Sequence, residues 1–413
     1  MKAILRGAQI YTDGTMKKSD FLLDGTSLSV FGGDVSAPSA IPVFDNIAVL
    51  PGFCDVHVHL REPGFSYKET IGTGSLAAAR GGYTCVLSMP NLAPTPDTKE
   101  NLKVQLDLIE RDAVIKVIPY GTITKGEGGL ELSDMAAMNE QVAGYSDDGR
   151  GVQSEEMMLR AMELAASLGK PIVAHCEDNS LLRGGYIHDG EYARAHGHRG
   201  ICSESEWGPI KRDIELVKKS GCSYHVCHIS TKESVELIRQ AKAEGVDITC
   251  ETAPHYILLD DSSMEEDARF KMNPPLRSAE DRLAILEGIK DGTIDAIATD
   301  HAPHSAEEKS RGLEKSAMGV VGIETAFPLV YTYLVKTGII TMERAVELLS
   351  ISPRRRFGIT SDVGFSIWRL GEKKPIDAKD FLSKGKSTPF LGTPVEAECL
   401  LTVYEGKAVY SAL

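Results

Sequence analysis

The sequence predicts an α/β protein with a (β/α)8 TIM-type barrel and a small β-sandwich domain formed from both chain termini. From about residue 46, short apolar runs alternate with helical patterns, as in a series of βαβ units. Polar residues follow almost every apolar run, as they do where the strands of a barrel end. The two ends of the chain instead carry short alternating segments between Gly and Asp turns.

Eight predicted strands share a short apolar run bounded by turn residues. They span residues 47–57, 83–89, 113–120, 142–146, 171–175, 223–228, 246–251 and 294–299. Helical patterns lie at residues 75–80, 99–111, 154–168, 203–220, 232–244, 279–290, 323–336 and 342–350. This alternation fits a barrel. The alternative is a doubly wound open sheet, which would concentrate its polar residues at one switch point.

The chain ends predict a second, smaller unit. Alternating runs occupy residues 2–11 and 21–28, and similar runs return at 365–370, 398–404 and 408–410. We expect a composite β domain of residues 1–46 and 356–413, and a catalytic, metal-dependent barrel of residues 47–355.

The amino-acid composition limits the classes of binding partner that this protein can have. The 413-residue chain is 42% hydrophobic and has a net charge of −14. No apolar run approaches the roughly 20 residues of a membrane helix, and no long basic cluster is present, so we expect neither membrane nor nucleic acid partners. The N-terminus lacks the apolar region of a signal peptide, which predicts a cytoplasmic protein. The eight cysteines form no C-x-x-C pair, so we expect buried thiols.

Two histidines at the end of the first barrel strand predict a metal site. His57 and His59 lie two residues apart, so a strand points both imidazoles to the same side, where they can reach one metal ion. Arg61 follows directly and provides a fixed cation. A metal beside a cation indicates a hydrolytic site for an anionic substrate.

Later strand ends add further possible ligands. His175 ends the fifth predicted strand, His228 the sixth and Asp300 the eighth. A hydrolytic metal centre needs imidazoles and carboxylates that converge, and the carboxyl ends of barrel strands bring such residues together. The fourth strand ends in Asp147 and Asp148, of which only one can face inward; their spacing leaves open which one.

His225 serves as a contrast to these residues. It lies three positions before His228, so strand alternation predicts that the two side chains face opposite sides. We therefore expect only His228 to face the barrel axis.

Residues 55–64 (Asp-Val-His-Val-His-Leu-Arg-Glu-Pro-Gly) resemble a motif of the dihydroorotases, in the amidohydrolase superfamily. Further segments resemble the same family, at residues 67–69, 89–91, 146–149, 174–177, 228–230, 273–277 and 299–304. Residues 311–329 and 387–392 resemble its class I branch.

The resemblance implies two Zn²⁺ ions per subunit, bridged by an aspartate and by a water or hydroxide. His57 and His59 would bind the buried ion, and His175 and His228 the more exposed one. Many relatives bridge the ions with a carboxylated lysine, but no lysine lies between residues 140 and 170. Class I enzymes use an aspartate there, and the motif match favours Asp148.

The resemblance also implies the reaction, the reversible conversion of (S)-dihydroorotate to N-carbamoyl-L-aspartate in pyrimidine biosynthesis. Asp300 would bind the buried ion and transfer the proton. Arg61, Asn91 and His304 would hold the substrate carboxylate, and Asn273 would line the ring. We expect a homodimer, and an association with an aspartate carbamoyltransferase stays open.

Two other functions compete with this interpretation. A related cyclic amidase, such as an allantoinase or hydantoinase, is disfavoured because a hydantoin lacks the carboxylate that Arg61 and Asn91 would hold. A non-catalytic scaffold for an aspartate carbamoyltransferase would have lost metal ligands, whereas all six candidates are present. Residues 305–318 are expected to form a flap over the site or a subunit contact.

Overall fold

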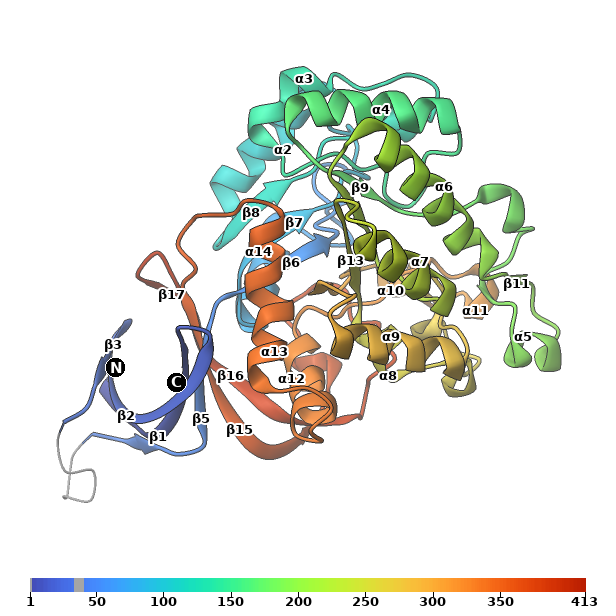
Figure 1. Ribbon diagram of the computed structural model, residues 1–413. Helices are drawn as coiled ribbons and strands as arrows, with labels where there is room; N and C mark the ends of the chain where they lie inside the picture. The colour runs from blue at the N-terminus through green and yellow to red at the C-terminus, as the bar shows by residue number, and fades with distance from the viewer. Residues whose placement is uncertain (1, 33–40) are drawn as a thin grey trace.

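The computed structural model describes residues 2–32 and 41–413 and has two parts (Figure 1). A barrel ringed by helices occupies most of the chain, and a curled sheet at its lower left carries both termini. No helix within the two described ranges is long and apolar enough to cross a membrane. All eight cysteines are free thiols.

The barrel contains two parallel sheets. One consists of β6 (Phe53–Val58), β7 (Tyr83–Ser88) and β8 (Lys116–Pro119); the other of β9 (Ile172–Ala174), β12 (Tyr224–Val226), β13 (Ile248–Thr252) and β14 (Ala296–Ile297). Tyr145 bridges them by pairing with Gly121 on one side and Ile172 on the other. Pairing of Val58 with His301 closes the circle. The predicted strand at 142–146 is thus reduced to a single bridging residue.

The predicted strand at 47–57 is two strands, because one continuous apolar run serves both sheets. β5 (Ile47–Pro51) pairs with β1 (Lys2–Thr12) and β15 (Phe365–Pro375) in the terminal sheet, and β6 begins the barrel. Gly52 lies between them, where an added Cβ would be 2.2 Å from Thr84 Oγ1. We propose that the domain boundary lies at Gly52.

The major helices lie between the barrel strands at the predicted positions. They are α1 (Ile71–Arg80), α2 (Lys99–Asp112), α4 (Glu155–Leu168), α6 (Glu204–Ser220), α7 (Lys232–Ala243) and α9 (Ala279–Asp291). Hydroxyl side chains of Thr98, Ser154 and Thr231 cap helix starts, and left-handed Gly169 and Gly221 end two helices. These local signals explain why the boundaries were predictable.

Shorter helices complete the loops and the C-terminal part of the barrel. They are α3 (Met135–Met138), α5 (Glu191–His196), α8 (Pro254–Leu258), α10 (Ala306–Lys309), α11 (Gly312–Lys315), α12 (Ala326–Val330), α13 (Met342–Val346) and α14 (Ser352–Arg356). π-Helical turns at Tyr331–Val335 and Glu347–Ile351 continue α12 and α13. The predicted helix at 323–336 therefore starts later and changes its winding midway.

The terminal sheet confirms the expected β-sandwich from both chain ends. Its strand order is β17-β16-β15-β5-β1-β2-β3, with β4 (Val43–Phe44) paired to β1. The remaining strands are β2 (Thr15–Asp24), β3 (Ser27–Val30), β16 (Pro394–Tyr404) and β17 (Lys407–Ser411); β10 (Ile187–His188) and β11 (Gly200–Ile201) form a separate pair. Leu5, Phe21, Val49, Ile367 and Val403 share its core.

An aromatic cluster joins the sheet to the barrel. Trp368 of β15 is buried, with its ring 4.5 Å from that of Phe327 and 6.0 Å from that of Phe53, between centroids. At Gly82 an added Cβ would lie 2.5 Å from the Trp368 ring, so glycine permits this close contact. The two parts therefore share a packed interface.

Candidate metal and substrate site

The predicted site residues meet at the carboxyl ends of the barrel strands. Nine of the ten line one cavity of about 230 Å³: His59, Arg61, Asn91, Asp148, His175, His228, Asn273, Asp300 and His304. His57 lies beneath it, fully buried. A cavity of this size suits a small ring.

Three of these residues have unusual backbone conformations. Arg61, His228 and Asp300 follow barrel strands and have φ values of 62°, 30° and 44°, in the left-handed region. A non-glycine residue adopts such a conformation at a cost, and residues of this kind concentrate at functional sites. The turn also interrupts strand alternation, so each side chain can point into the cavity.

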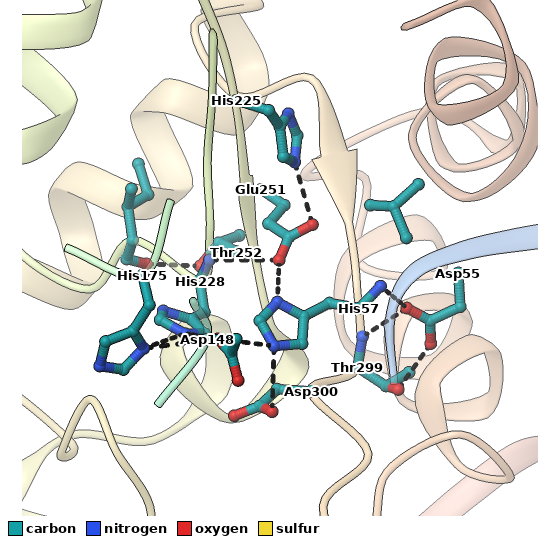
Figure 2. Close-up of polar contacts among 12 residues, drawn as sticks. Asp55, His57, Asp148, His175, His225, His228, Glu251, Thr252, Thr299 and Asp300 are labelled. Atoms are coloured by element: carbon teal, nitrogen blue, oxygen red, sulfur yellow. Dashed lines mark hydrogen bonds and ion pairs between the residues drawn. The ribbon is translucent and has the colours of Figure 1, made fainter. Parts of the chain in front are cut away.

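The first group of candidate ligands surrounds Asp300, whose contact with His57 is drawn in Figure 2. Oδ1 of Asp300 lies 3.1 Å from His59 Nε2 and 3.6 Å from His57 Nε2. His57, His59 and Asp300 each offer one ligand atom, all within 4.8 Å of one another. This is the separation expected of atoms that share one ion.

The second group surrounds Asp148. Its Oδ1 lies 3.4 Å from His57 Nε2 and 3.5 Å from both His175 Nδ1 and His228 Nε2. Its Oδ2 faces His59 Nε2 at 3.4 Å, so one carboxylate reaches all four histidines. Asp147 points elsewhere and accepts hydrogen bonds from the Ile123 and Thr124 amides. Of the two adjacent carboxylates, the structure therefore brings Asp148 into the cavity.

The unpaired atoms at the centre fit a metal. His57 Nε2 and Asp148 Oδ1 are buried and have no hydrogen-bond partner among the described residues. Nδ1 of His175 and Nε2 of His228 face each other at 3.0 Å. Unpaired buried polar atoms are costly. Imidazole nitrogen and carboxylate oxygen are donors that Zn²⁺ accepts, so the residues present can hold a metal.

The charges of the site keep its carboxylates ionised. Burial alone would raise the pKa of Asp148, but His57, His175 and His228 outweigh burial and lower it well below its usual range. Burial also opposes ionisation of Asp300, whose pKa His59 and His57 nevertheless lower. Both groups are therefore available as anionic ligands.

A supporting pair beneath the cavity was missed from the sequence. Glu251 Oε1 lies 2.6 Å from His57 Nδ1, and Glu251 Oε2 lies 3.1 Å from His225 Nε2 (Figure 2). The expectation that His225 faces away from the barrel axis is wrong. His228 lies past the end of β12 in a left-handed turn, so strand alternation does not connect the two. Thr249 Oγ1 lies 2.8 Å from His225 Nδ1 and ends the row of hydrogen-bonded side chains that starts at His57.

The pattern of β13 could have identified Glu251. Thr249 and Glu251 are polar residues two positions apart in β13, so both point to one side of the strand. Such a carboxylate commonly orients a metal-ligating histidine through the ring nitrogen that the metal does not use. Cys227 joins His57 and Glu251 in a further group with ligand atoms within 4.8 Å.

One wall of the cavity carries the predicted carboxylate-binding residues. Arg61 donates from Nε to the Pro303 carbonyl at 3.2 Å, and its Nη2 lies 3.4 Å from His304 Nε2. Asn91 Oδ1 lies 2.9 Å from His59 Nδ1. Arg61, Asn91 and His304 are therefore held by other groups rather than free to move.

Two further lining residues lie at the end of residues 305–318, the segment expected to form a flap or a subunit contact, and directly after it. Met318 and Gly319 line the cavity, and the Met318 carbonyl lies 2.8 Å from His304 Nε2. Lys309 in α10 donates to the carbonyls of Lys271, Ala317 and Gly319 at 2.8–3.2 Å. No sequence motif marked Met318 or Gly319, because their contribution depends on the path of the loop.

Comparisons with known proteins agree with this geometry. A family model described as dihydro-orotase-like matches residues 47–234. A dihydroorotase from Fusobacterium nucleatum subsp. nucleatum is 47% identical over 98% of both chains, and one from Geobacillus sp. is 45% identical over 99% of both.

Solved structures share the fold. L-Hydantoinase (dihydropyrimidinase) from Arthrobacter aurescens superposes with a TM-score of 0.83 at 25% identity, covering 100% of this chain and 96% of that one. Dihydropyrimidinase from Brevibacillus agri NCHU1002 gives 0.80 at 22% identity, over 100% and 95%. Such structures carry the barrel and terminal β-sandwich of amidohydrolases. Given the near-complete coverage of its sequence relatives, the chain belongs to the dihydroorotase family.

Proposed function

We propose that this enzyme is a class I dihydroorotase, which interconverts (S)-dihydroorotate and N-carbamoyl-L-aspartate in pyrimidine biosynthesis. The observation that carries the proposal is one cavity lined by five candidate metal ligands and a buried arginine, with the sixth candidate ligand, His57, directly beneath it. Curated dihydroorotases at 45–50% identity over most of the chain support it.

We propose two Zn²⁺ ions as the cofactor. His57, His59 and Asp300 would hold one, His175 and His228 the other, and Asp148 would bridge them. Its two oxygens, which face different histidines, support the bridging role. When bound, the metals would acidify the attacking water and polarise the ring carbonyl.

Arg61 would bind the substrate carboxylate. Guanidinium and carboxylate match as paired donors and acceptors, and the Pro303 carbonyl fixes the Arg61 plane through Nε. Asn91 accepts from His59 through Oδ1, which leaves its Nδ2 to donate to the same carboxylate. Burial and the charges of Arg61 and Lys68 lower the pKa of His304 to about 3, so its imidazole is neutral near neutral pH.

Asp300 would transfer the proton. Its carboxylate is ionised and lies in the cavity wall, so it can take a proton from the attacking water. It would then deliver that proton to the ring nitrogen as the amide bond breaks. Ring closure of carbamoyl aspartate uses the same two transfers in reverse.

The two competing functions are less well supported. The hydantoinases share the fold at 18–25% identity, whereas the dihydroorotases reach 45–50%. A scaffold protein would not need six buried, converging ligands. We also propose a homodimer in the cytoplasm, where eight free thiols are typical. Size-exclusion chromatography, alone and with an aspartate carbamoyltransferase, tests the assembly.

The decisive test combines metal analysis with turnover. The purified protein should contain Zn, convert dihydroorotate to carbamoyl aspartate, lose activity to a chelator and regain it with Zn²⁺. Arg61→Met should lower kcat/KM for dihydroorotate roughly 100-fold, through loss of two charge-assisted hydrogen bonds. Its effect on dihydrouracil, which lacks the carboxylate, should be small. Turnover of allantoin or hydantoin but not dihydroorotate would refute the proposal, and a folded metal-free protein would favour the scaffold.

A further inference from the structure

Glu177 contacts two residues of the site although neither prediction nor mechanism uses it. Its Oε1 accepts a hydrogen bond from Asn273 Nδ2 at 2.9 Å, and its Oε2 lies 3.5 Å from His175 Nε2. The Glu177 side chain is 10% exposed. This carboxylate therefore links a cavity-lining amide to a candidate metal ligand.

The contact fixes which end of the Asn273 amide faces the cavity. An ionised carboxylate only accepts hydrogen bonds, so the NH₂ group of Asn273 must point to Glu177. The opposite atom, Oδ1, is buried and is without a partner in residues 2–32 and 41–413. Asn273 lines the cavity, so a hydrogen-bond donor of a molecule bound there can pair with Oδ1.

The same logic applies to His175. Its Nδ1 is the nitrogen that faces Asp148 and His228, at 3.5 Å and 3.0 Å. A carboxylate at Nε2 favours a proton on that nitrogen, so Nδ1 is the ring nitrogen that remains turned to Asp148 and His228. The Glu177 carboxylate thus determines which amide atom of Asn273 and which ring nitrogen of His175 are turned away from it.

The backbone holds Glu177 in place. Its carbonyl accepts a hydrogen bond from Gln153 Nε2 at 2.9 Å. At Gly151, an added Cβ would lie 2.8 Å from the His175 carbonyl oxygen, so residues 151–153 pack tightly against this strand end. A carboxylate held this way can orient its partners rather than follow them.

We propose that Glu177 is a positioning residue that turns the Asn273 amide so that Oδ1 accepts a hydrogen bond from a ring N–H of the substrate. The inference rests on the proposed function and deepens it. Dihydroorotate is a cyclic ureide with two N–H donors, and the buried Oδ1 would be paired only when one of them is bound. Asn273 would thus recognise the ureide, while Arg61 recognises the carboxylate.

A double-mutant cycle tests the coupling. Glu177→Ala and Asn273→Ala should each raise KM for dihydroorotate about tenfold, the effect of one lost hydrogen bond. The double variant should raise KM no further than Asn273→Ala, because an orienting group has no effect once its target is gone. Affinity for orotate, a planar analogue that retains the carboxylate and both N–H groups, should follow the same pattern by calorimetry without turnover.

Control variants separate this role from folding. Glu177→Met keeps the volume but not the acceptor and should behave like Glu177→Ala. Asp178→Ala removes the adjacent carboxylate, whose partner is Ser180 outside the cavity, and should leave KM and orotate affinity unchanged. Additive effects, or wild-type KM and orotate affinity in both Glu177 variants, would overturn the inference. Absence of dihydroorotate turnover in the wild type would instead refute the proposed function.

Discussion

At the scale of single residues, the candidate metal ligands His57 and His59 are oriented by contacts to the ring nitrogens that face away from the cavity. Glu251 reaches Nδ1 of His57, and Asn91 reaches Nδ1 of His59. Each contact leaves Nε2 of the ring turned to the cavity, which fixes the tautomer before any metal binds. The candidate site is therefore preorganised by carbonyl and carboxylate acceptors of the protein itself.

Asp300→Asn should abolish turnover of dihydroorotate, by roughly 1,000-fold or more, because an amide cannot take a proton from the attacking water. The fold should survive, since the amide keeps the size of the carboxylate. Steady-state kinetics and a thermal melt check this prediction. Near-normal kcat would remove Asp300 from proton transfer.

His188 should make the fold sensitive to acid. Burial, together with the charge of Arg277, lowers its pKa to about 4, against an ordinary value of 6.5. Between these pH values His188 is protonated in the unfolded chain but not in the folded chain. The free energy of unfolding therefore falls as the pH drops from 6.5 to 4. His188→Asn should reduce this loss by about 2 kcal/mol at pH 5. Urea unfolding at pH 7 and pH 5 measures it; an equal loss in both proteins would exclude His188.

The residues that sequence reasoning found and missed differ in their physical basis. His57 and His59 were identifiable because strand geometry and a two-residue spacing suffice. The inward position of His225 was not, because the left-handed turn at His228 is invisible in a spacing rule. No sequence pattern identifies Glu177 as a positioning residue, because its proposed role depends on Asn273, which lies 96 positions away along the chain.

At the scale of elements, Lys309 links three backbone carbonyls at the loop that carries α10 and α11. Lys309→Met removes three hydrogen bonds to the carbonyls of Lys271, Ala317 and Gly319. We expect faster hydrogen exchange across residues 305–319 and a lower kcat/KM, because Met318 and Gly319 line the cavity. Lys315→Met, on the exposed side of α11, should change neither quantity. Unchanged exchange in the Lys309 variant would contradict this account.

Boundaries were predictable where local chemistry sets them. Ser154 and Gly169 bracket α4 as an N-cap and a left-handed C-cap, and the predicted helix at 154–168 matches it. The division of 47–57 into β5 and β6 was not predictable, because both halves are buried and both have the apolar side chains of a core strand. Which sheet an apolar strand joins depends on distant partners, here β1 and β15.

At the scale of the whole molecule, the barrel and the terminal sheet should unfold together. Trp368→Ala should lower the free energy of unfolding by about 3–5 kcal/mol, because it removes the ring that packs against Phe53 and Phe327 and leaves a cavity. Trp207→Ala, at a half-buried position, should cost less. Urea titration followed by circular dichroism should show one transition in the wild type. Two separate wild-type transitions would show that the interface does not couple the parts.

The position of β5 between the two chain ends has a consequence for synthesis. Ile47 pairs with Arg369, so one edge of β5 stays without its neighbour until more than three hundred later residues have left the ribosome. Through that interval the growing chain presents an open strand edge, which is a template for wrong pairing. The barrel can form during this time, but its first strand, β6, directly follows β5, which still lacks its partner β15 in the terminal sheet. We expect the slowest step of folding to be the late docking of β15, and the nascent chain to need protection until then.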